Sequence, residues 1–265
     1  MLEDMLKQIG PLDEHAMKAC EDRWNSIAKP MYAFGKFEPM TIRMAGIAGS
    51  SQFKIDKKAL VIMCADHGVL EEGVSQSDQE ITAVMTEGFT RMECCASVMA
   101  DLAGVDVFPV DIGVARDLIP EVINRKIAYG TKNMAKEPAM TREEAIRSIE
   151  IGIEMVADLK KKGYEILCVG EMGVGNTTPC SAMTSAFLNV PVAEVTGRGS
   201  GLKAEGLRRK VEVLERIMAS YTFDPDDPLD VLCKVGGFEI GGMAGLYLGA
   251  AIYRIPVVAD GVISC

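Results

Sequence analysis

The stretch Ala59-Leu-Val-Ile-Met-Cys-Ala65, which runs into Asp66-His67-Gly68, decides the fold class of this chain. A continuous apolar run of this length, without polar alternation, is typical of a strand that is buried on both faces. Such a strand belongs to the interior of a parallel sheet, and here it ends at polar residues and a glycine. The stretch therefore predicts a sheet covered by helices, with polar groups at the carboxyl ends of its strands.

Three more apolar runs fit the same sheet. Residues 105–112 predict a second strand, although Pro109 favours a position at the sheet edge. Residues 166–169 and 255–259 predict two further strands, and the last one ends at Asp260-Gly261. Because each run ends in a small or acidic residue, we expect a ligand site at these strand ends.

Helical signals alternate with the strands. Ser-Asp-Gln-Glu at 77–80 and Thr-Arg-Glu-Glu at 141–144 are capping boxes. The first predicts a helix to about residue 102, and the second predicts a helix that stops at Lys162-Gly163. Residues 202–221 predict another helix. The order of strands and helices predicts an α/β fold, a Rossmann-like parallel sheet flanked by helices.

Two regions outside this alternation shape the domain prediction. Residues 1–45 have helical periodicity with a break at Lys29-Pro30, so we expect a small helical N-terminal subdomain. Residues 46–265 are then a Rossmann-like nucleotide-binding domain, with a turn-rich break at 224–228. The small residues of 235–245 predict a helix that packs closely on the sheet.

Composition limits the partners. Hydrophobic residues make up 48% of the chain, charged residues 25%, and the formal net charge is −10. Nucleic acids and anionic membranes are held largely by Lys and Arg, so neither is expected as a partner. No signal-peptide core begins the chain, and the apolar run 241–253 is too short to span a bilayer. We therefore expect a cytoplasmic protein.

The eight cysteines do not suggest a metal site. None of them forms a C-x-x-C pair, and only His15 and His67 could join them as ligands. Most lie in apolar runs, where a reduced cysteine acts as a small hydrophobe. We expect core thiols in a reducing compartment, and we interpret His67 as a hydrogen-bonded structural residue.

The stretch VGEMGVGNTTP at 169–179 is the first candidate site. Glu171 would be a carboxylate at a strand end, and Gly173 and Gly175 would let the backbone approach a ligand. A tight strand–helix turn with a solvated glutamate is the alternative, but it does not account for an acid and Asn176 together. Thr178 as N-cap and Pro179 at the first helical position would start a helix whose free N–H groups face an anion.

The stretch VTGRGSGL at 195–202 is the second candidate site. Its alternating glycines could form a backbone cradle for a phosphate, with Lys210 as the point charge. The spacing fits neither the dinucleotide pattern nor the Walker pattern, which argues against an oxidoreductase. A flexible loop beside a solvated basic helix face at 208–210 is an equally good interpretation of these residues alone.

Together these segments resemble the nicotinate-nucleotide:dimethylbenzimidazole phosphoribosyltransferase family of cobalamin (vitamin B12) biosynthesis. The resemblance is carried, in family order, by residues 64–77, 169–179, 195–210, 234–251 and 255–264. It implies transfer of ribose 5-phosphate from nicotinate mononucleotide to an aromatic base such as 5,6-dimethylbenzimidazole. The products would be alpha-ribazole 5'-phosphate and nicotinate, without a cofactor. It also implies a homodimer, with a heterodimer as the alternative.

The resemblance also assigns roles to residues. Glu171 would be the acid in the pocket and the catalytic residue, and Ser77 and Met85 would line the slot for the aromatic base. The remaining predicted substrate-binding residues are Gly173, Asn176, Gly197, Gly199, Lys210 and Gly261.

The chain departs from the family at several places. Residues 29–35 read KPMYAFG where the family has a Lys-Pro-Pro-Gly-Ser-Leu-Gly-like segment, and Met85 replaces a polar residue of some members. Family members continue beyond the position of Cys265 with a glutamate that is the usual catalytic base, and no residue here matches it. The alternative hypothesis is therefore a non-catalytic nucleotide-binding homologue or partner subunit. Apolar residues at 255–258 would then favour self-association.

Overall fold

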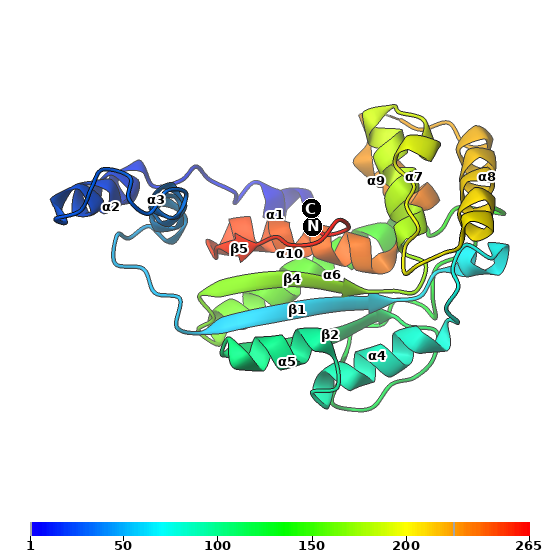
Figure 1. The fold of residues 1–265 in the computed structure, drawn as a ribbon, viewed down its shortest axis with the longest axis horizontal. Coiled ribbons are helices and arrows are strands. Elements are labelled where there is room, and N and C mark those ends of the chain that lie inside the picture. Colours follow the sequence, from blue (N-terminus) through cyan, green and yellow to red (C-terminus); the bar gives the residue numbers. More distant parts are fainter. Residues whose placement is uncertain (1, 225) are drawn as a thin grey trace.

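A five-stranded parallel sheet forms the centre of the computed structural model, which describes residues 2–224 and 226–265 (Figure 1). The strand order is β3-β2-β1-β4-β5, with the decisive stretch as β1 in the middle. The strands are β1 (Lys58–Ala65), β2 (Val105–Gly113), β3 (Ile123–Asn124), β4 (Ile166–Met172) and β5 (Val257–Val258). The predicted parallel sheet is confirmed, although β5 is shorter than the predicted strand.

Helices cover both faces of the sheet, so β1 is buried on both sides. Val61 and Met63 point into the main core, where α10 packs on the sheet and α6 packs along α10. Ile62 and Cys64 point to the opposite face, which α4 and α5 cover (Figure 1). These helices are α4 (Glu80–Thr90), α5 (Cys95–Leu102), α6 (Arg142–Lys161) and α10 (Phe238–Tyr253).

The edge position that Pro109 favours is also found. Strand β3 pairs with β2 only at Val110 and Asp111, so β2 has a single partner strand over the rest of its length. Pro109 lies just before this short pairing, where β2 is an edge strand on that side. A residue without an N–H group is tolerated there, because no hydrogen bond to a neighbouring strand is lost on that side.

Helix α6 begins and ends as the sequence predicts. The side chain of Thr141 accepts a hydrogen bond from the Glu144 N–H at 3.2 Å, and the Glu144 carboxylate accepts one from the Thr141 N–H at 2.8 Å. The chain leaves the helix through Gly163, whose φ of 81° is readily adopted only by glycine.

The other predicted capping box, at residues 77–80, is not formed. The Ser77 N–H donates to the side chain of Ser75, and the Glu80 carboxylate pairs with Arg116 at 3.0 Å instead of returning to the helix start. The single helix predicted from here to about residue 102 is also wrong. The chain breaks after α4 at Met92, which has a φ of 61°, and restarts as α5.

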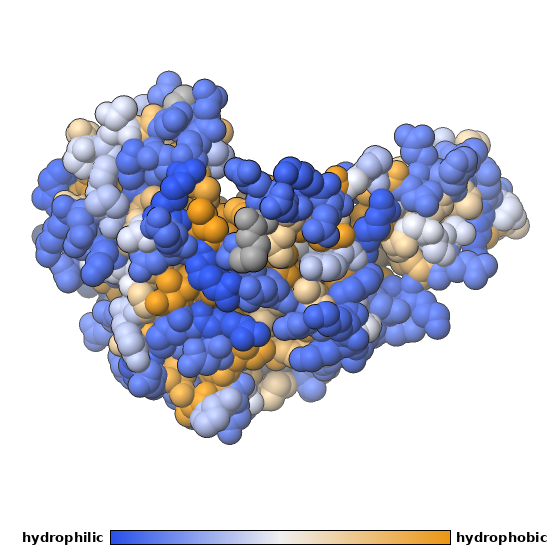
Figure 2. Space-filling view, turned by 180° about the vertical axis from the view of Figure 1, so that it is seen from behind, coloured by the Kyte–Doolittle hydropathy of each residue, from blue (hydrophilic) through white to orange (hydrophobic). Residues whose placement is uncertain are grey.

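The first part of the chain contains α1 (Leu2–Leu6), α2 (Glu14–Ser26) and α3 (Phe37–Ala48). Helix α1 lies against α10, whereas α2 and α3 lie beyond the amino ends of the strands (Figure 1). Helices α2 and α3 pack on each other as a lobe at one end of the molecule (Figures 1 and 2). Helix α3 runs past residue 45, so a domain boundary there would cut a helix, and the division into two domains stays a prediction.

Three helices rise at the carboxyl ends of the strands: α7 (Thr177–Leu188), α8 (Ala204–Ser220) and α9 (Pro228–Val235) (Figure 1). Short 3-10 turns at Gly68–Glu72 and Val192–Glu194 complete this end. In the predicted break at 224–228, Asp227 caps α9 and Pro228 is its first residue, while residue 225 lies outside the described part. This end of the sheet is the one at which a ligand site is expected.

The cysteine prediction holds only in part. All eight cysteines are free, and Cys20, Cys64 and Cys94 are buried, whereas Cys95 and Cys265 are exposed and therefore are not core thiols. In the described residues, no group of His, Cys, Asp and Glu side chains could hold a metal ion. Over the same residues, no helix has the length and apolar character needed to cross a membrane.

The small residues of α10 bring it very close to α6 as well as to the sheet. A Cβ atom on Gly245 would lie 2.0 Å from the carbonyl oxygen of Ile149, and one on Gly152 would lie 2.2 Å from that of Gly242. Both contacts are with backbone, so a side chain could be accommodated only by separating the two helices.

Gly245→Ala should therefore lower the free energy of unfolding by about 1–3 kcal/mol, because overpacking forces the helices apart. Urea unfolding followed by circular dichroism measures this change. Ala244→Ser, on the exposed side of the same helix, is the control and should change stability by no more than about 0.5 kcal/mol. Equal midpoints for the two variants would contradict the close contact.

Candidate active site

A cavity of about 380 Å³ opens at the carboxyl end of β4, within the size range of small-molecule sites. Four segments form most of its wall: the loop before α4, α4 itself, the β4–α7 connection and the glycine-rich loop before α8. The predicted site residues that line it are Ser77, Met85, Glu171, Gly173, Asn176 and Gly199.

Glu171 supplies a carboxylate to this cavity from the carboxyl end of β4. Asn176 donates a hydrogen bond from its side-chain nitrogen to Glu171 Oε2, which fixes the direction of the carboxylate. Burial raises the pKa of Glu171, and the negative charge of Glu239 raises it further. The Asn176 hydrogen bond and His67 oppose these effects without cancelling them, so Glu171 holds a proton more tightly than an ordinary glutamate.

Part of the cavity wall is apolar. Val74 and Leu202 are buried, while Ile81 and Met85 present their side chains from α4. Such a surface suits a flat hydrophobic ring, and the hydroxyl of Ser77 at its rim can orient a polar atom of that ring.

Lys210 brings a buried positive charge to the site from α8. Its side chain is fully buried, and Nζ donates to Thr177 Oγ1 at 2.6 Å and to the Gly197 carbonyl oxygen at 3.5 Å. No carboxylate of the described residues lies within ion-pair distance of Nζ, and burial lowers the pKa of Lys210 to about 8. A buried cation without a counter-ion is costly, so this position favours an incoming anion.

The start of α7 adds to that preference for an anion. The helix begins at Thr177 with Asn176 as its N-cap, so the predicted cap at Thr178 is wrong by two positions. The Thr178 hydroxyl is instead buried and has no hydrogen-bond partner among the described residues. Lys210 Nζ therefore lies beside the positive end of a helix dipole, an arrangement that a phosphate would stabilise.

The glycine-rich loop before α8 packs closely against the start of α7. Gly199 has a φ of 53°, and a Cβ atom on it would lie 3.0 Å from Thr177 Oγ1 and 3.8 Å from Lys210 Nζ. Gln76 donates to the Ser200 carbonyl oxygen at 2.8 Å, which ties this loop to the loop before α4. The two halves of the cavity are thus held together.

Three predicted residues do not line the cavity directly. Lys210 lies behind Thr177, the Gly197 side of the loop is open, and Gly261 lies two residues before the lining residue Ile263. Conversely, Arg198 and Thr177 line the cavity and were not predicted. Arg198 lies between Gly197 and Gly199 of the predicted phosphate cradle. A basic residue at this position could have been predicted to bind the phosphate from the sequence alone.

His67 is a buried structural residue, as predicted. Its Nε2 shares a hydrogen bond of 2.8 Å with Glu239 Oε1, and both side chains are almost inaccessible. The partner could not be predicted, because Glu239 lies on α10, far along the chain.

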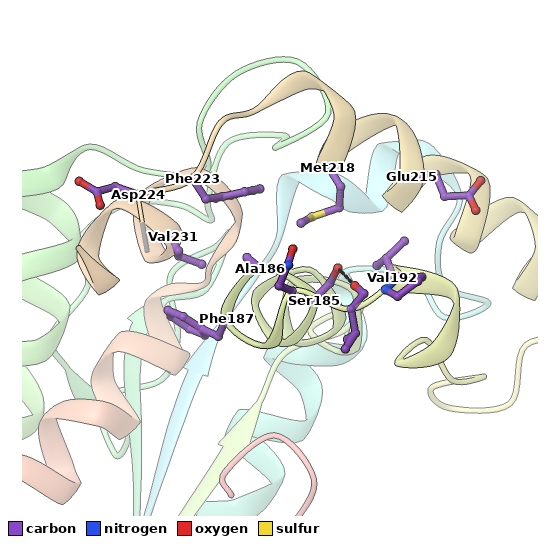
Figure 3. A pocket seen from close by; sticks show the side chains of 12 residues that line it. Ser185, Ala186, Phe187, Val192, Glu215, Met218, Phe223, Asp224 and Val231 are labelled. Carbon is purple, nitrogen blue, oxygen red and sulfur yellow. Dashed lines mark hydrogen bonds between the residues drawn. The ribbon is translucent and has the colours of Figure 1, made fainter. Parts of the chain in front are cut away.

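A larger cleft of about 890 Å³ lies between the far end of α7, α8 and α9 (Figure 3). Phe187, Met218 and Phe223 give it an apolar lining, and Glu215 and Asp224 add negative charge. No basic side chain of the described residues lines it, so its charge would repel a phosphate. The smaller cavity, with its cation and helix start, is the better candidate for a nucleotide.

A protein-family model described as Phosphoribosyltransferase matches residues 9–265. The chain belongs to this phosphoribosyltransferase family. Its sequence is 45% identical over 265 residues to a nicotinate-nucleotide--dimethylbenzimidazole phosphoribosyltransferase of Clostridium perfringens, covering 100% of this chain and 73% of that protein. The like-named protein of Chloroflexus aggregans is 46% identical over 266 residues, covering 100% of this chain and 75% of its own length.

The fold agrees with this phosphoribosyltransferase family. The crystal structure of CobT from Thermus thermophilus superposes with a TM-score of 0.87 at 37% sequence identity, over 94% of this chain and 75% of that one. The family resemblance predicted from the motifs is therefore confirmed. The roles of the individual site residues stay predictions.

Proposed function

We propose that this phosphoribosyltransferase moves ribose 5-phosphate from nicotinate mononucleotide to 5,6-dimethylbenzimidazole or a similar aromatic base. Alpha-ribazole 5'-phosphate and nicotinate are the products, which places the reaction in the assembly of the cobalamin nucleotide loop. The observation that carries the proposal is the cavity at the end of β4, where an anion site, a carboxylate and an apolar wall meet. The names of the full-length relatives support the same reaction.

The chemistry requires little acid catalysis. Nicotinate leaves from a ring nitrogen that is already cationic, so the leaving group becomes neutral at that atom as the bond breaks. The incoming base must lose its N–H proton as the new bond forms, which requires a carboxylate nearby. Glu171 lies at the cavity wall with its direction fixed by Asn176, and its raised pKa makes it a stronger base than an ordinary glutamate.

The phosphate would bind where Lys210, Thr177 and the glycine-rich loop meet. The N–H groups at the start of α7 and the Lys210 cation both favour a phosphate there. The base would lie on the apolar wall formed by Val74, Ile81 and Met85. Arg198 lines the cavity on the loop side and adds a second positive charge.

A direct assay tests the proposal. The purified chain is incubated with nicotinate mononucleotide and 5,6-dimethylbenzimidazole, and released nicotinate and alpha-ribazole 5'-phosphate are measured together. We expect both to form in equal amounts. Nucleotide binding without either product would favour the non-catalytic alternative and overturn the proposed reaction.

Affinity for nicotinate mononucleotide should fall above pH 8. Only the charged form of Lys210 binds the phosphate strongly, and its pKa in the free protein is about 8. We expect Kd to rise roughly tenfold in total between pH 8 and pH 9.5, with little change from Lys210 below pH 7. Isothermal titration across this range measures it, and Lys210→Met should show no such rise. An identical slope in that variant would contradict the assignment.

The chain is also proposed to act as a homodimer in the cytoplasm. The resemblance to the family supports this. Of the apolar residues at 255–258, Ile255 is buried, so the expected surface there is found only at Val258, which is exposed and with Val262 provides apolar surface for self-association. Sedimentation of the purified chain tests the oligomeric state, and a monomer at all concentrations would remove the dimer.

A further inference from the structure

His67 and Glu239 form a buried ion pair directly behind the cavity wall. His67 follows β1, and Glu239 is in the first turn of α10. Their side chains are 1% and 0% exposed, and 2.8 Å separates His67 Nε2 from Glu239 Oε1. Neither residue lines the cavity, so neither is a catalytic residue in the proposed reaction.

Glycine backbone encloses the pair from two directions. A Cβ atom on Gly173 would lie 3.0 Å from His67 Nε2, and Gly173 is a residue of the cavity wall, two positions after Glu171. A Cβ atom on Gly237 would lie 2.5 Å from His67 Cε1 and 2.6 Å from Glu239 Oε2. The imidazole is thus in contact with both the β4–α7 connection and the start of α10.

The pair is unusual because its hydrogen bonding is incomplete. Glu239 Oε2 is buried and has no hydrogen-bond partner in the described residues. A buried carboxylate in this state is stabilised mainly by the charge of its neighbour, so the imidazole is favoured in its charged form. Burial lowers the pKa of His67, but the charge and hydrogen bond of Glu239, together with the charges of Asp66 and Glu171, outweigh burial, and the pKa is raised above its usual value.

We propose that His67 and Glu239 are positioning residues for Glu171: the pair holds the β4–α7 connection against the end of β1 and sets the local charge that the Glu171 carboxylate experiences. Its link to catalysis rests on the proposed function, whereas the electrostatic coupling to Glu171 does not. The two members act in opposite directions, because a negative neighbour favours the neutral carboxyl group and a positive neighbour favours the carboxylate.

Other ionisable groups also face Glu171. Cys64 on β1 and Cys180 on α7 both interact with its charge, and their own thiol pKa values are raised chiefly by burial. Asp66 lies beside His67 at the end of β1 and interacts with His67 and Glu239. Both thiols are neutral at pH 7 and add no charge near Glu171. Asp66 is the same in every variant below, so differences between the variants come from His67 and Glu239.

The test measures the titration of Glu171 itself. The full chain, labelled with ¹³C in the glutamate carboxyl groups, is titrated by NMR, and the Glu171 signal is assigned by its loss in Glu171→Gln. Glu239→Gln should lower the Glu171 midpoint by about half a pH unit or more, because the larger charge effect on Glu171 is removed. His67→Gln should raise the Glu171 midpoint, because a positive neighbour that favours the carboxylate is removed.

Two further variants keep the test independent of folding defects. Ser148→Ala removes a hydroxyl that is equally buried beneath α10 and should leave the Glu171 midpoint unchanged. The double variant His67→Gln/Glu239→Gln has neither charge of the pair. Its free energy of unfolding should be higher than that of His67→Gln, which leaves the Glu239 carboxyl group buried without its partner. Midpoints that move in the same direction in both single variants, or no further than in Ser148→Ala, would overturn the proposal.

The pH profile of kcat extends the test to the reaction. The acid limb should move to lower pH in Glu239→Gln and to higher pH in His67→Gln, with KM for nicotinate mononucleotide unchanged. If the NMR midpoints shift as expected while no variant releases nicotinate, the proposed function fails and the positioning pair stands. If nicotinate is released but the acid limbs coincide, the pair has no role in catalysis.

Discussion

Glu171→Gln should lower kcat for phosphoribosyl transfer about 100- to 10,000-fold, the range expected for loss of a general base. The amide keeps the size of the side chain and can still accept the hydrogen bond from Asn176. It cannot accept a proton from the incoming base. The defect should therefore appear in kcat, with little change in KM for nicotinate mononucleotide.

The pH dependence gives the same prediction a second readout. Burial and Glu239 raise the pKa of Glu171, so the carboxylate is lost as the pH falls through that raised value. In the unaltered chain, kcat should fall toward acid pH over the range in which Glu171 takes up its proton. The residual activity of Glu171→Gln should lack this acid limb.

Glu215→Gln is the matched control, because Glu215 lines the larger cleft and not the cavity at β4. We expect its kcat to equal that of the unaltered chain. Stability of Glu171→Gln at pH 7 should not decrease, because the change removes a partly buried charge. Full activity in Glu171→Gln would exclude Glu171 as the base. A large loss in Glu215→Gln would place the reaction in the larger cleft.

Four of the five strands, all except β3, and most helices could be predicted from the sequence because their signals are local. The apolar run of β1 and the Thr141 capping box depend on neighbouring residues alone, and both are found. The box at residues 77–80 failed because Glu80 pairs with Arg116, a partner from a distant loop. Helix starts of this kind depend on tertiary contacts that a single sequence does not display.

The site also shows this difference between features with local sequence signals and features that depend on tertiary contacts. The motifs identified Glu171, Asn176 and Gly199 as site residues, and the cavity brings these together. The pairing of His67 with Glu239 joins residues from two ends of the chain, and no local pattern marks it. The burial of Lys210 was also invisible, since its neighbours Arg208 and Arg209 are exposed and suggested a solvated basic face.

Lys210→Met should weaken the binding of nicotinate mononucleotide about 10- to 100-fold, the typical value of a charge-assisted hydrogen bond. Methionine fills the same buried space without a charge. The start of α7 and the backbone of the glycine-rich loop remain, so some phosphate affinity should persist. Isothermal titration measures Kd directly, and Arg208→Met, an exposed change on the same helix, should leave it within about twofold.

Stability should change in the opposite direction in this variant. The pKa of Lys210 is about 8 in the folded chain and 10.5 as a free side chain, so the folded state binds fewer protons between these values. The burial cost is therefore fully present below pH 8 and disappears as the pH rises toward 10.5. Removing the amine should raise the free energy of unfolding at pH 7 by about 1–3 kcal/mol.

A variant that binds its nucleotide more weakly and yet unfolds at higher urea is the combined outcome that distinguishes a phosphate site from a structural lysine. A lysine needed for folding would lose stability when replaced, whereas an unpaired cation kept for a ligand is a strained position that the ligand relieves. Saturating nicotinate mononucleotide should accordingly stabilise the unaltered chain more than Lys210→Met in urea. Equal stabilisation of both, or a less stable Lys210→Met, would show that the amine does not hold the phosphate.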